Sequence, residues 1–276
     1  MENITSGGYE ISQVVNSKYG HAIREIEVWG TVVAVEAASS IATEAELHKG
    51  ITEVIAYVNH IDEVFSTYKP DSIVSRLRRQ EIQIADTSEE VKDVWNRCLF
   101  ARDLTQGAFD PWAVLGGFDP SGLVKGLAAD RCSEIMLDNG AEHVQINAAG
   151  DLALRGGYFN GTEVIPWSIG VVNPENRQEI VEVFEIMDGA IATSGTYERG
   201  AHILDPHTGL IAIGARSATV IGADGGLTDA LATALMVEGR DGAIWFGNPV
   251  LAQYSAWVID RNDDISWSLG PKATKP

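Results

Sequence analysis

The sequence predicts an α+β fold in a single compact domain, with a helix-rich N-terminal half and a strand-rich C-terminal half. Before residue 140, apolar residues recur at helical spacing over long segments; after it, short β-branched segments alternate with turn residues. The 276 residues are 45% hydrophobic, which suits one large domain or two small ones. Because no low-complexity linker divides the chain, we expect one α+β unit with a ligand cleft between its halves.

The helix-rich half opens with a pair of strands. Residues 23–38 are rich in β-branched residues and are predicted to form two strands bent at Gly30. A long helix follows from about Thr43 to Phe65, where apolar residues fall at helical spacing. Three more helices are predicted over residues 73–78, 89–105 and 124–137, the last ending at Asn139-Gly140.

The second half is predicted to consist of strands interrupted by one helix around Asp229. The expected strands are 143–146, 152–155, 167–172, 178–186, 190–193, 201–204, 215–221 and 254–259. Residues 242–245 are apolar and form another candidate short helix. We therefore expect a domain over residues 21–269, preceded by an N-terminal extension (1–20) and followed by a flexible tail (270–276).

Charge and composition exclude several classes of function. The formal net charge is −19, which argues against binding to nucleic acids or anionic membranes, since both need basic patches. The first residues lack the pattern of a signal peptide, and no apolar run is long enough to be inserted in a membrane, so we expect a cytoplasmic protein. Cys98 and Cys132 have no CxxC partner, which argues against a disulfide framework or a zinc site.

The most informative segment is Leu227–Ala234. Asp229 and Thr233 lie four residues apart in a helix-forming run, so they share one helix face. A glycine-rich turn, residues 221–226, precedes them. A carboxylate and a hydroxyl on the first turns of a helix could bind Mg²⁺, which favours oxygen ligands and often accompanies phosphates. The alternative is that Thr228 or Asp229 caps the helix and Thr233 bonds to its own backbone.

Other segments could carry chemistry, each with an ordinary structural alternative. Residues 107–111 could form a rigid wall for a planar ligand, or a glycine helix end followed by a turn. Residues 119–126 lead into a helix, where exposed backbone and Lys125 could bind phosphate, although a capping turn explains the same residues. Residues 147–151 could contact a ligand or form a hairpin turn.

His202 is one of six histidines and lies among apolar residues, where a structural role competes with a catalytic one. With Ser194 and Asp205 it could form a hydrolase triad, but the chain has no Gly-x-Ser-x-Gly elbow. The triad is therefore disfavoured.

Taken together in their order, these segments resemble the ApbE-type FAD:protein FMN transferases. The matching residues are 30–31, 65–72, 74–77, 107–111, 119–126, 128–130, 147–152, 192–195, 202–206 and 228–234. The resemblance implies an ApbE-like, T-fold-related domain. It also implies an enzyme that uses Mg²⁺ to cleave the pyrophosphate of FAD, attaches FMN through a phosphoester to a Thr or Ser of an acceptor protein, and releases AMP. A FAD pyrophosphatase that forms FMN and AMP, or a non-catalytic FAD-binding protein, would be compatible with the same site.

The resemblance also assigns roles to individual residues. Asp229, Thr233 and the backbone carbonyl of Gly122 correspond to metal ligands, and His202 to the base that accepts the proton of the acceptor hydroxyl. The residues that correspond to the FAD cradle are Tyr68, Ala108, Phe109, Asp110, Asp119 and Lys125. The chain departs from the family pattern at Trp29, where methionine is usual, and at residues 147–151, where alanine replaces a common glycine.

Overall fold

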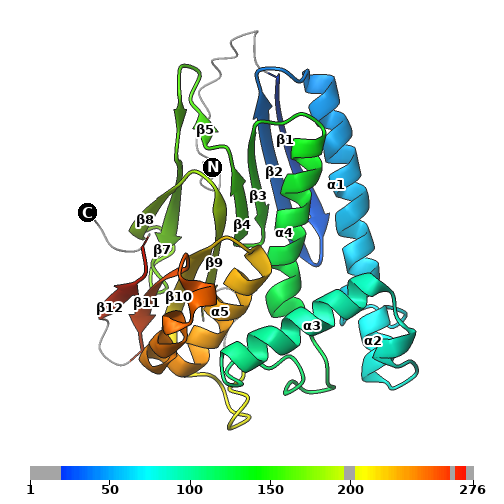
Figure 1. Cartoon of the computed structure of the whole chain (residues 1–276), viewed down its shortest axis with the longest axis vertical. Coiled ribbons are helices and arrows are strands. Elements are labelled where there is room, and N and C mark those ends of the chain that lie inside the picture. The colour runs from blue at the N-terminus through cyan, green and yellow to red at the C-terminus, as the bar shows by residue number, and fades with distance from the viewer. Residues whose placement is uncertain (1–19, 196–202, 262–264, 272–276) are drawn as a thin grey trace, which may run out of the picture.

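A computed structural model describes residues 20–195, 203–261 and 265–271 of the chain. Its centre is an eight-stranded sheet in which all neighbouring strands are antiparallel (Figure 1). In sheet order the strands are β1 (Gly20–Val28), β2 (Thr31–Ser39), β3 (His143–Ala148), β4 (Asp151–Arg155), β9 (Gly189–Gly195), β10 (Ala215–Gly222), β11 (Ser255–Asp260) and β12 (Ser266–Leu269). The first two strands come from the helix-rich part of the chain, so both halves build one sheet.

Strands β1 and β2 form a tight hairpin, as the strand pair bent at Gly30 predicted. The two turn residues, Trp29 and Gly30, both have positive φ, at 59° and 69°, which is the backbone of the two-residue turns that fit twisted strands. The indole of Trp29 donates a hydrogen bond to the carbonyl of Val58 at 3.1 Å. The tryptophan that departs from the family pattern therefore ties the hairpin to the following helix.

The helices begin at residues with capping side chains. Helix α1 (Glu44–Phe65) starts after Thr43, which forms a capping box with Glu46. Serine side chains cap α2 (Ile73–Arg78) and α3 (Glu89–Leu104). The remaining helices are α4 (Ser121–Asp138) and α5 (Gly225–Glu238). The predicted helices therefore form close to their expected bounds.

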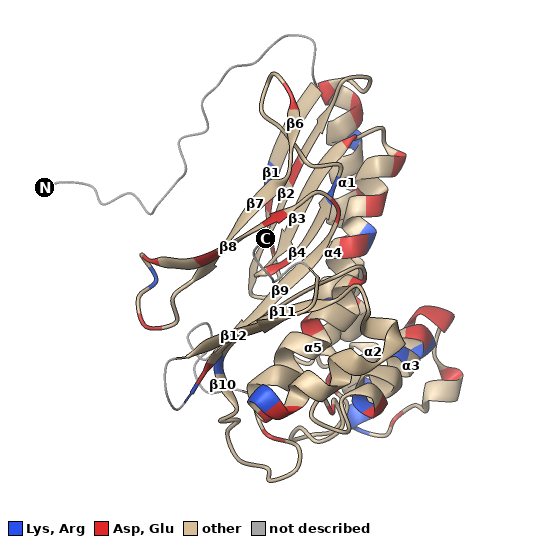
Figure 2. Ribbon diagram, turned by 60° about the vertical axis from the view of Figure 1, so that its left-hand side comes forward, with Lys and Arg blue, Asp and Glu red and all other residues tan. Residues whose placement is uncertain are grey.

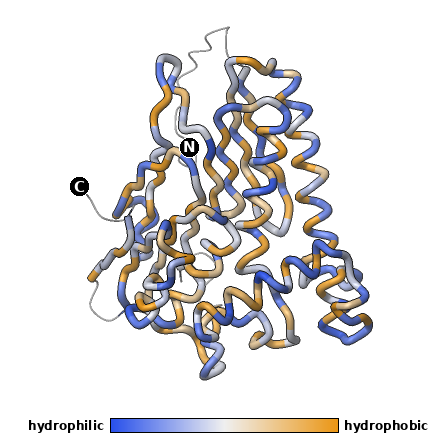
Figure 3. The backbone as a smooth tube through the Cα atoms, viewed as in Figure 1, coloured by the Kyte–Doolittle hydropathy of each residue, from blue (hydrophilic) through white to orange (hydrophobic). Residues whose placement is uncertain are grey.

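Helices cover one face of the sheet. Helices α1 and α4 pack side by side against the strands at the β1 end, and α5 packs on β9 and β10 (Figure 1). Apolar residues gather along these strands and inner helices, whereas hydrophilic residues are frequent on α2 and α3 (Figure 3). Acidic residues recur along α1 and in many loops (Figure 2). The main core lies between the helices and the sheet.

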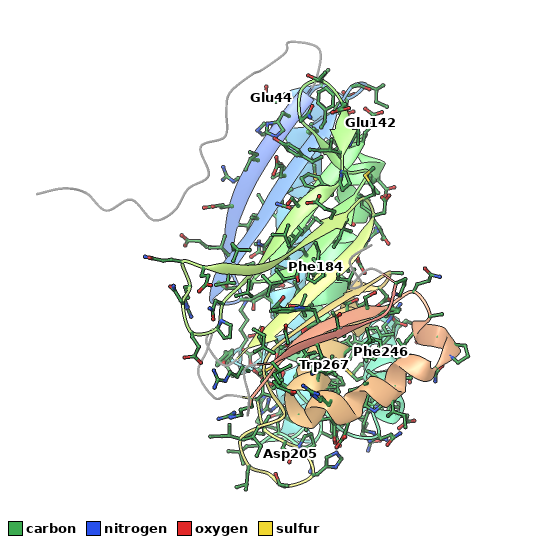
Figure 4. All side chains as sticks on the ribbon, turned by 90° about the vertical axis from the view of Figure 1, so that its left-hand side faces the viewer. Glu44, Glu142, Phe184, Asp205, Phe246 and Trp267 are labelled. Atoms are coloured by element: carbon green, nitrogen blue, oxygen red, sulfur yellow. The ribbon has the colours of Figure 1, made fainter. Side chains whose placement is uncertain are left out.

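A second hairpin, β7 (Trp167–Val172) and β8 (Ile180–Ile186), packs on the other face of the sheet. Successive side chains of a strand point to opposite faces of the sheet, so the central strands contribute to two cores. Ile191 belongs to the core beneath this hairpin, and its neighbour Ala192 belongs to the core between the sheet and the helices. Phe184 of β8, labelled in Figure 4, belongs to the hairpin core. The hairpin is thus anchored by apolar packing.

The smaller elements are β5 (Tyr158–Phe159), β6 (Val164–Ile165) and the 3₁₀ helices η1 (Ile84–Asp86), η2 (Gly239–Gly247) and η3 (Pro249–Leu251). The candidate helix at 242–245 is thus part of a 3₁₀ helix.

One strand expectation is wrong: of residues 201–204, the two that are described form no strand, and Leu204 makes only an isolated bridge with Ile211. The reason is that residues 203–212 fold back on themselves, with the Ala212 amide donating to the Ile203 carbonyl at 2.9 Å.

The α+β prediction for one compact domain is confirmed, with the sheet running from Gly20 to Leu269. Of the expected extension and tail, residues 1–19 and 272–276 lie outside the described residues. Within the described ranges, no helix is both long enough and apolar enough to cross a membrane.

Cys98 and Cys132 are both free and buried, and burial raises the pKa of each thiol, so neither is suited to act as a nucleophile.

Candidate active site

A cavity of about 680 Å³ opens where the N-terminal turn of α4 meets α5 and the ends of β4 and β9. Its walls come from both sides of residue 140, as expected for a cleft formed by the two halves. The lining residues are Thr31, Ala108, Phe109, Asp110, Pro111, Val114, Asp119, Ser121, Gly122, Lys125, Ala149, Asp151, Val172, Arg177, Thr193, Ser194, Gly195, Ile203, Leu204, Pro206, Asp229 and Thr233. A space of this size suits a ligand as large as a nucleotide cofactor.

Helix α5 brings Asp229 and Thr233 to the cavity on one face. Asp224, not Thr228 or Asp229, caps the helix: its carboxylate accepts a hydrogen bond from the Leu227 amide at 2.8 Å. The capping alternative is therefore wrong for Asp229, which is 3% exposed and faces the cavity instead. Its carboxylate therefore forms part of the cavity wall.

Gly122 lies beside the hydroxyl of Thr233. A Cβ added to this glycine would lie 3.4 Å from Thr233 Oγ1 and 3.3 Å from the ring of Phe109. Its backbone departs from helical geometry, with φ −81° and ψ 20° inside the first turn of α4. Ser194 Oγ of β9 also lies 3.4 Å from Thr233 Oγ1. Helix α5 and strand β9 thus bring two hydroxyl oxygens together in the cavity wall, beside the backbone of Gly122 on α4.

Lys125 joins two buried carboxylates. Its ammonium forms ion pairs with Asp151 and, at 3.2 Å, with Asp229, which are 4% and 3% exposed. Burial alone would lower the pKa of Lys125, but the two carboxylates outweigh burial and raise its pKa above the usual range. Burial and the nearby charge of Asp151 raise the pKa of Asp229 to about 7 against the opposing effect of Lys125. Two carboxylates facing one ammonium leave the site with excess negative charge.

Helices α4 and α5 are held together behind these residues. Asp130 of α4 accepts a hydrogen bond from the amide of Gly225, the first residue of α5, at 2.6 Å. The other oxygen of Asp130 pairs with Arg155 of β4 at 2.7 Å. This carboxylate therefore fixes the start of α5 to α4 and to the sheet, and with it the positions of Asp229 and Thr233.

The loop residues at the cavity wall also hold their own backbone. Asp110 accepts a hydrogen bond from the Trp112 amide at 2.9 Å, and Asp119 accepts one from the Ser121 amide at 3.0 Å. Asp119 additionally lies 3.8 Å from Arg78. Asp110 and Asp119 therefore hold local turns, and the same two residues also line the cavity.

A second cavity of about 520 Å³ adjoins the first, because Ser121 and Lys125 line both. Tyr68, Trp29 and Phe65 give it aromatic walls, and the Tyr68 side chain is largely open to solvent at 89% exposure. The two cavities together provide a polar compartment next to an aromatic one.

The structure brings together most of the residues expected from the sequence. Eight of them line the first cavity: Ala108, Phe109, Asp110, Asp119, Gly122, Lys125, Asp229 and Thr233. Tyr68 lines the adjoining cavity, and His202 lies outside the described residues. Sequence reasoning did not count Asp151, Ser194 or Arg177 among the site residues. Asp151 and Ser194 lie in segments that match the family, which was the available signal, whereas nothing in the sequence pointed to Arg177.

Comparison with known proteins agrees with this geometry. A sequence model of the ApbE family matches residues 29–114 and 116–255. The chain is 26% identical over 248 residues to the FAD:protein FMN transferase of Vibrio cholerae, covering 69% of this chain and 73% of that protein. It is 24% identical to the protein of the same name from Haemophilus influenzae, covering 75% of this chain and 76% of that protein.

Solved structures share the fold. The flavin transferase ApbE from Vibrio cholerae superposes with a TM-score of 0.76 at 22% identity, over 91% of this chain and 97% of its own. The ApbE protein of Thermotoga maritima superposes with a TM-score of 0.75 at 24% identity, over 87% of this chain and 94% of its own. Since the family match spans most of the sequence, the chain belongs to the ApbE family.

Proposed function

We propose that this protein is a FAD:protein FMN transferase that attaches FMN to a hydroxyl of an acceptor protein. Family membership and the names of its relatives support this activity. The observation that carries the proposal is the group formed by Asp229, Thr233 and Gly122 in the cavity wall, since these are the positions that correspond to metal ligands in the family.

The residues present fit a magnesium ion. Asp229, Thr233 and the Gly122 carbonyl would supply the carboxylate, hydroxyl and carbonyl oxygens that Mg²⁺ prefers. Two carboxylates, Asp151 and Asp229, share the single positive charge of Lys125, and this arrangement also favours a divalent cation. Within the described part of the chain, no group of three His, Cys, Asp or Glu side chains lies together in a way that could hold a metal. Bound there, Mg²⁺ would neutralise charge on the pyrophosphate as it is cleaved.

The protein's own groups would bind and orient FAD. The aromatic cavity at Tyr68 suits a planar ring, and the polar cavity suits the pyrophosphate. Lys125 lines both cavities and would hold the carboxylates of Asp151 and Asp229 in place while placing a positive charge near the phosphates. Ala108, Phe109, Asp110 and Asp119 would complete the cradle.

The acceptor would be a protein that presents a threonine or serine to the site. The imidazole of His202 would take the proton of that hydroxyl as its oxygen attacks the phosphorus atom that becomes part of FMN; the bond to the AMP phosphate breaks, and AMP leaves. This role for His202 rests on the family resemblance alone.

The experiment that tests the function is intact mass spectrometry of an acceptor fragment co-expressed with the protein. A mass gain that corresponds to FMN supports transfer. Free FMN and AMP with an unmodified acceptor would instead identify a FAD pyrophosphatase, and bound but intact FAD a non-catalytic FAD-binding protein. Either of those results contradicts the proposal.

A further inference from the structure

Large apolar side chains gather on the outside of the loop formed by residues 203–213. Leu210 and Ile213 are 69% and 66% exposed, Ile211 is 47% exposed, and Leu204 is also exposed. Apolar residues exposed singly are normal on a protein surface, but a group of them beside a ligand cavity indicates a surface that contacts a partner. We name these four residues the rim patch.

The rim patch is continuous with the wall of the main cavity. Leu204 lines that cavity and forms an antiparallel bridge with Ile211. Residues opposite each other in such a bridge have their side chains on the same side, so Ile211 extends the apolar wall outward from Leu204. Ile213 follows two residues later, the spacing that returns a side chain to the same side of an extended segment. The buried Ala212 between the two isoleucines agrees with this alternation.

The loop that carries the rim patch is held in one conformation. The amide of Asp205, labelled in Figure 4, donates to the Leu210 carbonyl at 2.8 Å. The Asp205 carboxylate accepts a hydrogen bond from the Thr208 hydroxyl at 2.7 Å. At the base of the loop, Arg261 donates to the Ala212 carbonyl at 3.1 Å. A partner that binds a surface fixed in this way loses little affinity to ordering of the loop.

Of the molecules that could cover this patch, the acceptor protein fits its position best. The ring and pyrophosphate of FAD have the two adjoining cavities, so FAD does not need the outer surface of the loop. A net charge of −19 argues against an anionic membrane. The acceptor, in contrast, is a macromolecule whose hydroxyl has to enter the main cavity. Its chain must therefore lie across the edge of that cavity.

We propose that the rim patch binds the acceptor protein, at an extended segment that has apolar side chains near its target threonine or serine. This inference rests on the proposed function, because only a transferase needs an acceptor. It separates two tasks on one surface: the cavity holds FAD and performs the chemistry, and the rim patch supplies affinity for the acceptor.

The test is steady-state kinetics of FMN transfer to the acceptor fragment that gains FMN in the mass-spectrometry experiment. The double variant Ile211→Ser, Ile213→Ser should raise the KM for the acceptor by about 10- to 100-fold, as expected when two large apolar contacts are lost. The kcat and the affinity for FAD should stay the same, since the contacts are equal in the ground state and the transition state. Both side chains are exposed, so the melting temperature should be unchanged.

Ile244→Ser is the matched control. Ile244 of η2 is 72% exposed and lines neither of the two cavities, so its KM for the acceptor should be that of the native protein. A second measurement changes the acceptor. Replacing the apolar residues near its target hydroxyl with serine should raise the KM of the native protein, but should have little further effect with the double variant, because the contact is already lost.

Four results would overturn the inference: an unchanged acceptor KM in the double variant, weakened FAD binding, an equal effect in Ile244→Ser, or a change of oligomeric state in sedimentation with the KM unaltered. The last would show that a second copy of the chain covers the patch. The native protein separates this inference from the proposed function. If transfer occurs but the double variant keeps the native KM, the rim patch proposal fails alone; if FAD binds but no acceptor gains FMN, both fail.

Discussion

Gly126 of α4 and Gly225 of α5 lie in direct backbone contact. A Cβ added to Gly126 would overlap the carbonyl of Gly225, and a Cβ added to Gly225 would overlap the carbonyl of Gly126. Glycine is needed at both positions because any side chain would push the helices apart. Gly122 lies one turn before this contact on α4, and Asp229 one turn after it on α5. The contact therefore sets the separation between the oxygen atoms of the site.

Gly126→Ala should destabilise the protein and reduce transferase activity together. The added methyl group meets rigid backbone, so we expect a loss of about 1–3 kcal/mol in the free energy of unfolding. Displacement of Gly122 from Asp229 should also weaken the response to Mg²⁺. Chemical denaturation and a Mg²⁺ titration of activity measure the two effects. Gly247→Ala is the control, because a Cβ there meets no atom within 4 Å; equal behaviour of the two variants would contradict the prediction.

Much of the fold could be predicted because its signals are local. The helices predicted from about Thr43 and over residues 73–78 and 89–105 each begin beside a local cap in the structure: Thr43 with Glu46, Ser72 and Ser88. The turn at Trp29-Gly30 is equally local. The site residues of α5 follow from helical spacing, since Asp229 and Thr233 share a face whatever surrounds them.

The rest depends on pairings between distant segments. Strand β4 pairs with β9, but the residues between them form two separate strand pairs, β5–β6 and β7–β8, and nothing in β4 or β9 specifies that pairing. The ion pairs of Lys125 with Asp151 and Asp229 join residues 26 and 104 positions apart. Arg177 reaches the cavity only because its hairpin packs across the sheet. Such contacts form only when the sheet is assembled, so the sequence of a single segment does not predict them.

Asp229→Asn should abolish Mg²⁺-dependent activity while the protein stays folded. The amide keeps the shape of the side chain but removes the charge that a divalent ion needs. It also removes a buried carboxylate whose pKa is raised, so the ligand-free variant should melt at a higher temperature than the native protein at pH 8. Activity against Mg²⁺ concentration and thermal melts without Mg²⁺ measure both effects.

Asp224→Asn provides the matched control for this variant on the same helix. Asparagine is a good capping residue, so the start of α5 should remain intact and the Mg²⁺ response normal. A normal Mg²⁺ response in Asp229→Asn would remove Asp229 from the metal site.

Stability and metal affinity should depend on pH in opposite directions. The pKa of Asp229 is about 7 in the ligand-free fold against 3.8 as its ordinary value. Between these two values the folded state holds a proton that the unfolded state has lost, so stability without Mg²⁺ should fall as the pH rises toward 7 and then level off. Mg²⁺ competes with that proton, so its affinity should rise up to about tenfold per pH unit below about pH 7 and then level off.

Calorimetric Mg²⁺ titrations and melts between about pH 5.5 and about pH 8.5 test this coupling, because the range brackets the pKa. In Asp229→Asn the fall in stability attributed to Asp229 should disappear. A Mg²⁺ affinity in the native protein that does not change over this range would show that Asp229 is ionised throughout.

His202→Ala should abolish FMN transfer and leave FAD binding intact. The imidazole is expected to act on the acceptor hydroxyl and not on FAD, and a general base typically contributes about 10²–10⁴-fold to the rate. Transfer by the native protein should also slow as the pH falls and the imidazole becomes protonated. Acceptor mass spectrometry over time and FAD titrations measure the two properties.

His207→Ala is the control, since His207 lies 3.3 Å from Glu238 on the outer surface and does not line the main cavity. Near-native transfer by His202→Ala, or weakened FAD binding with a lower melting temperature, would instead indicate a structural histidine.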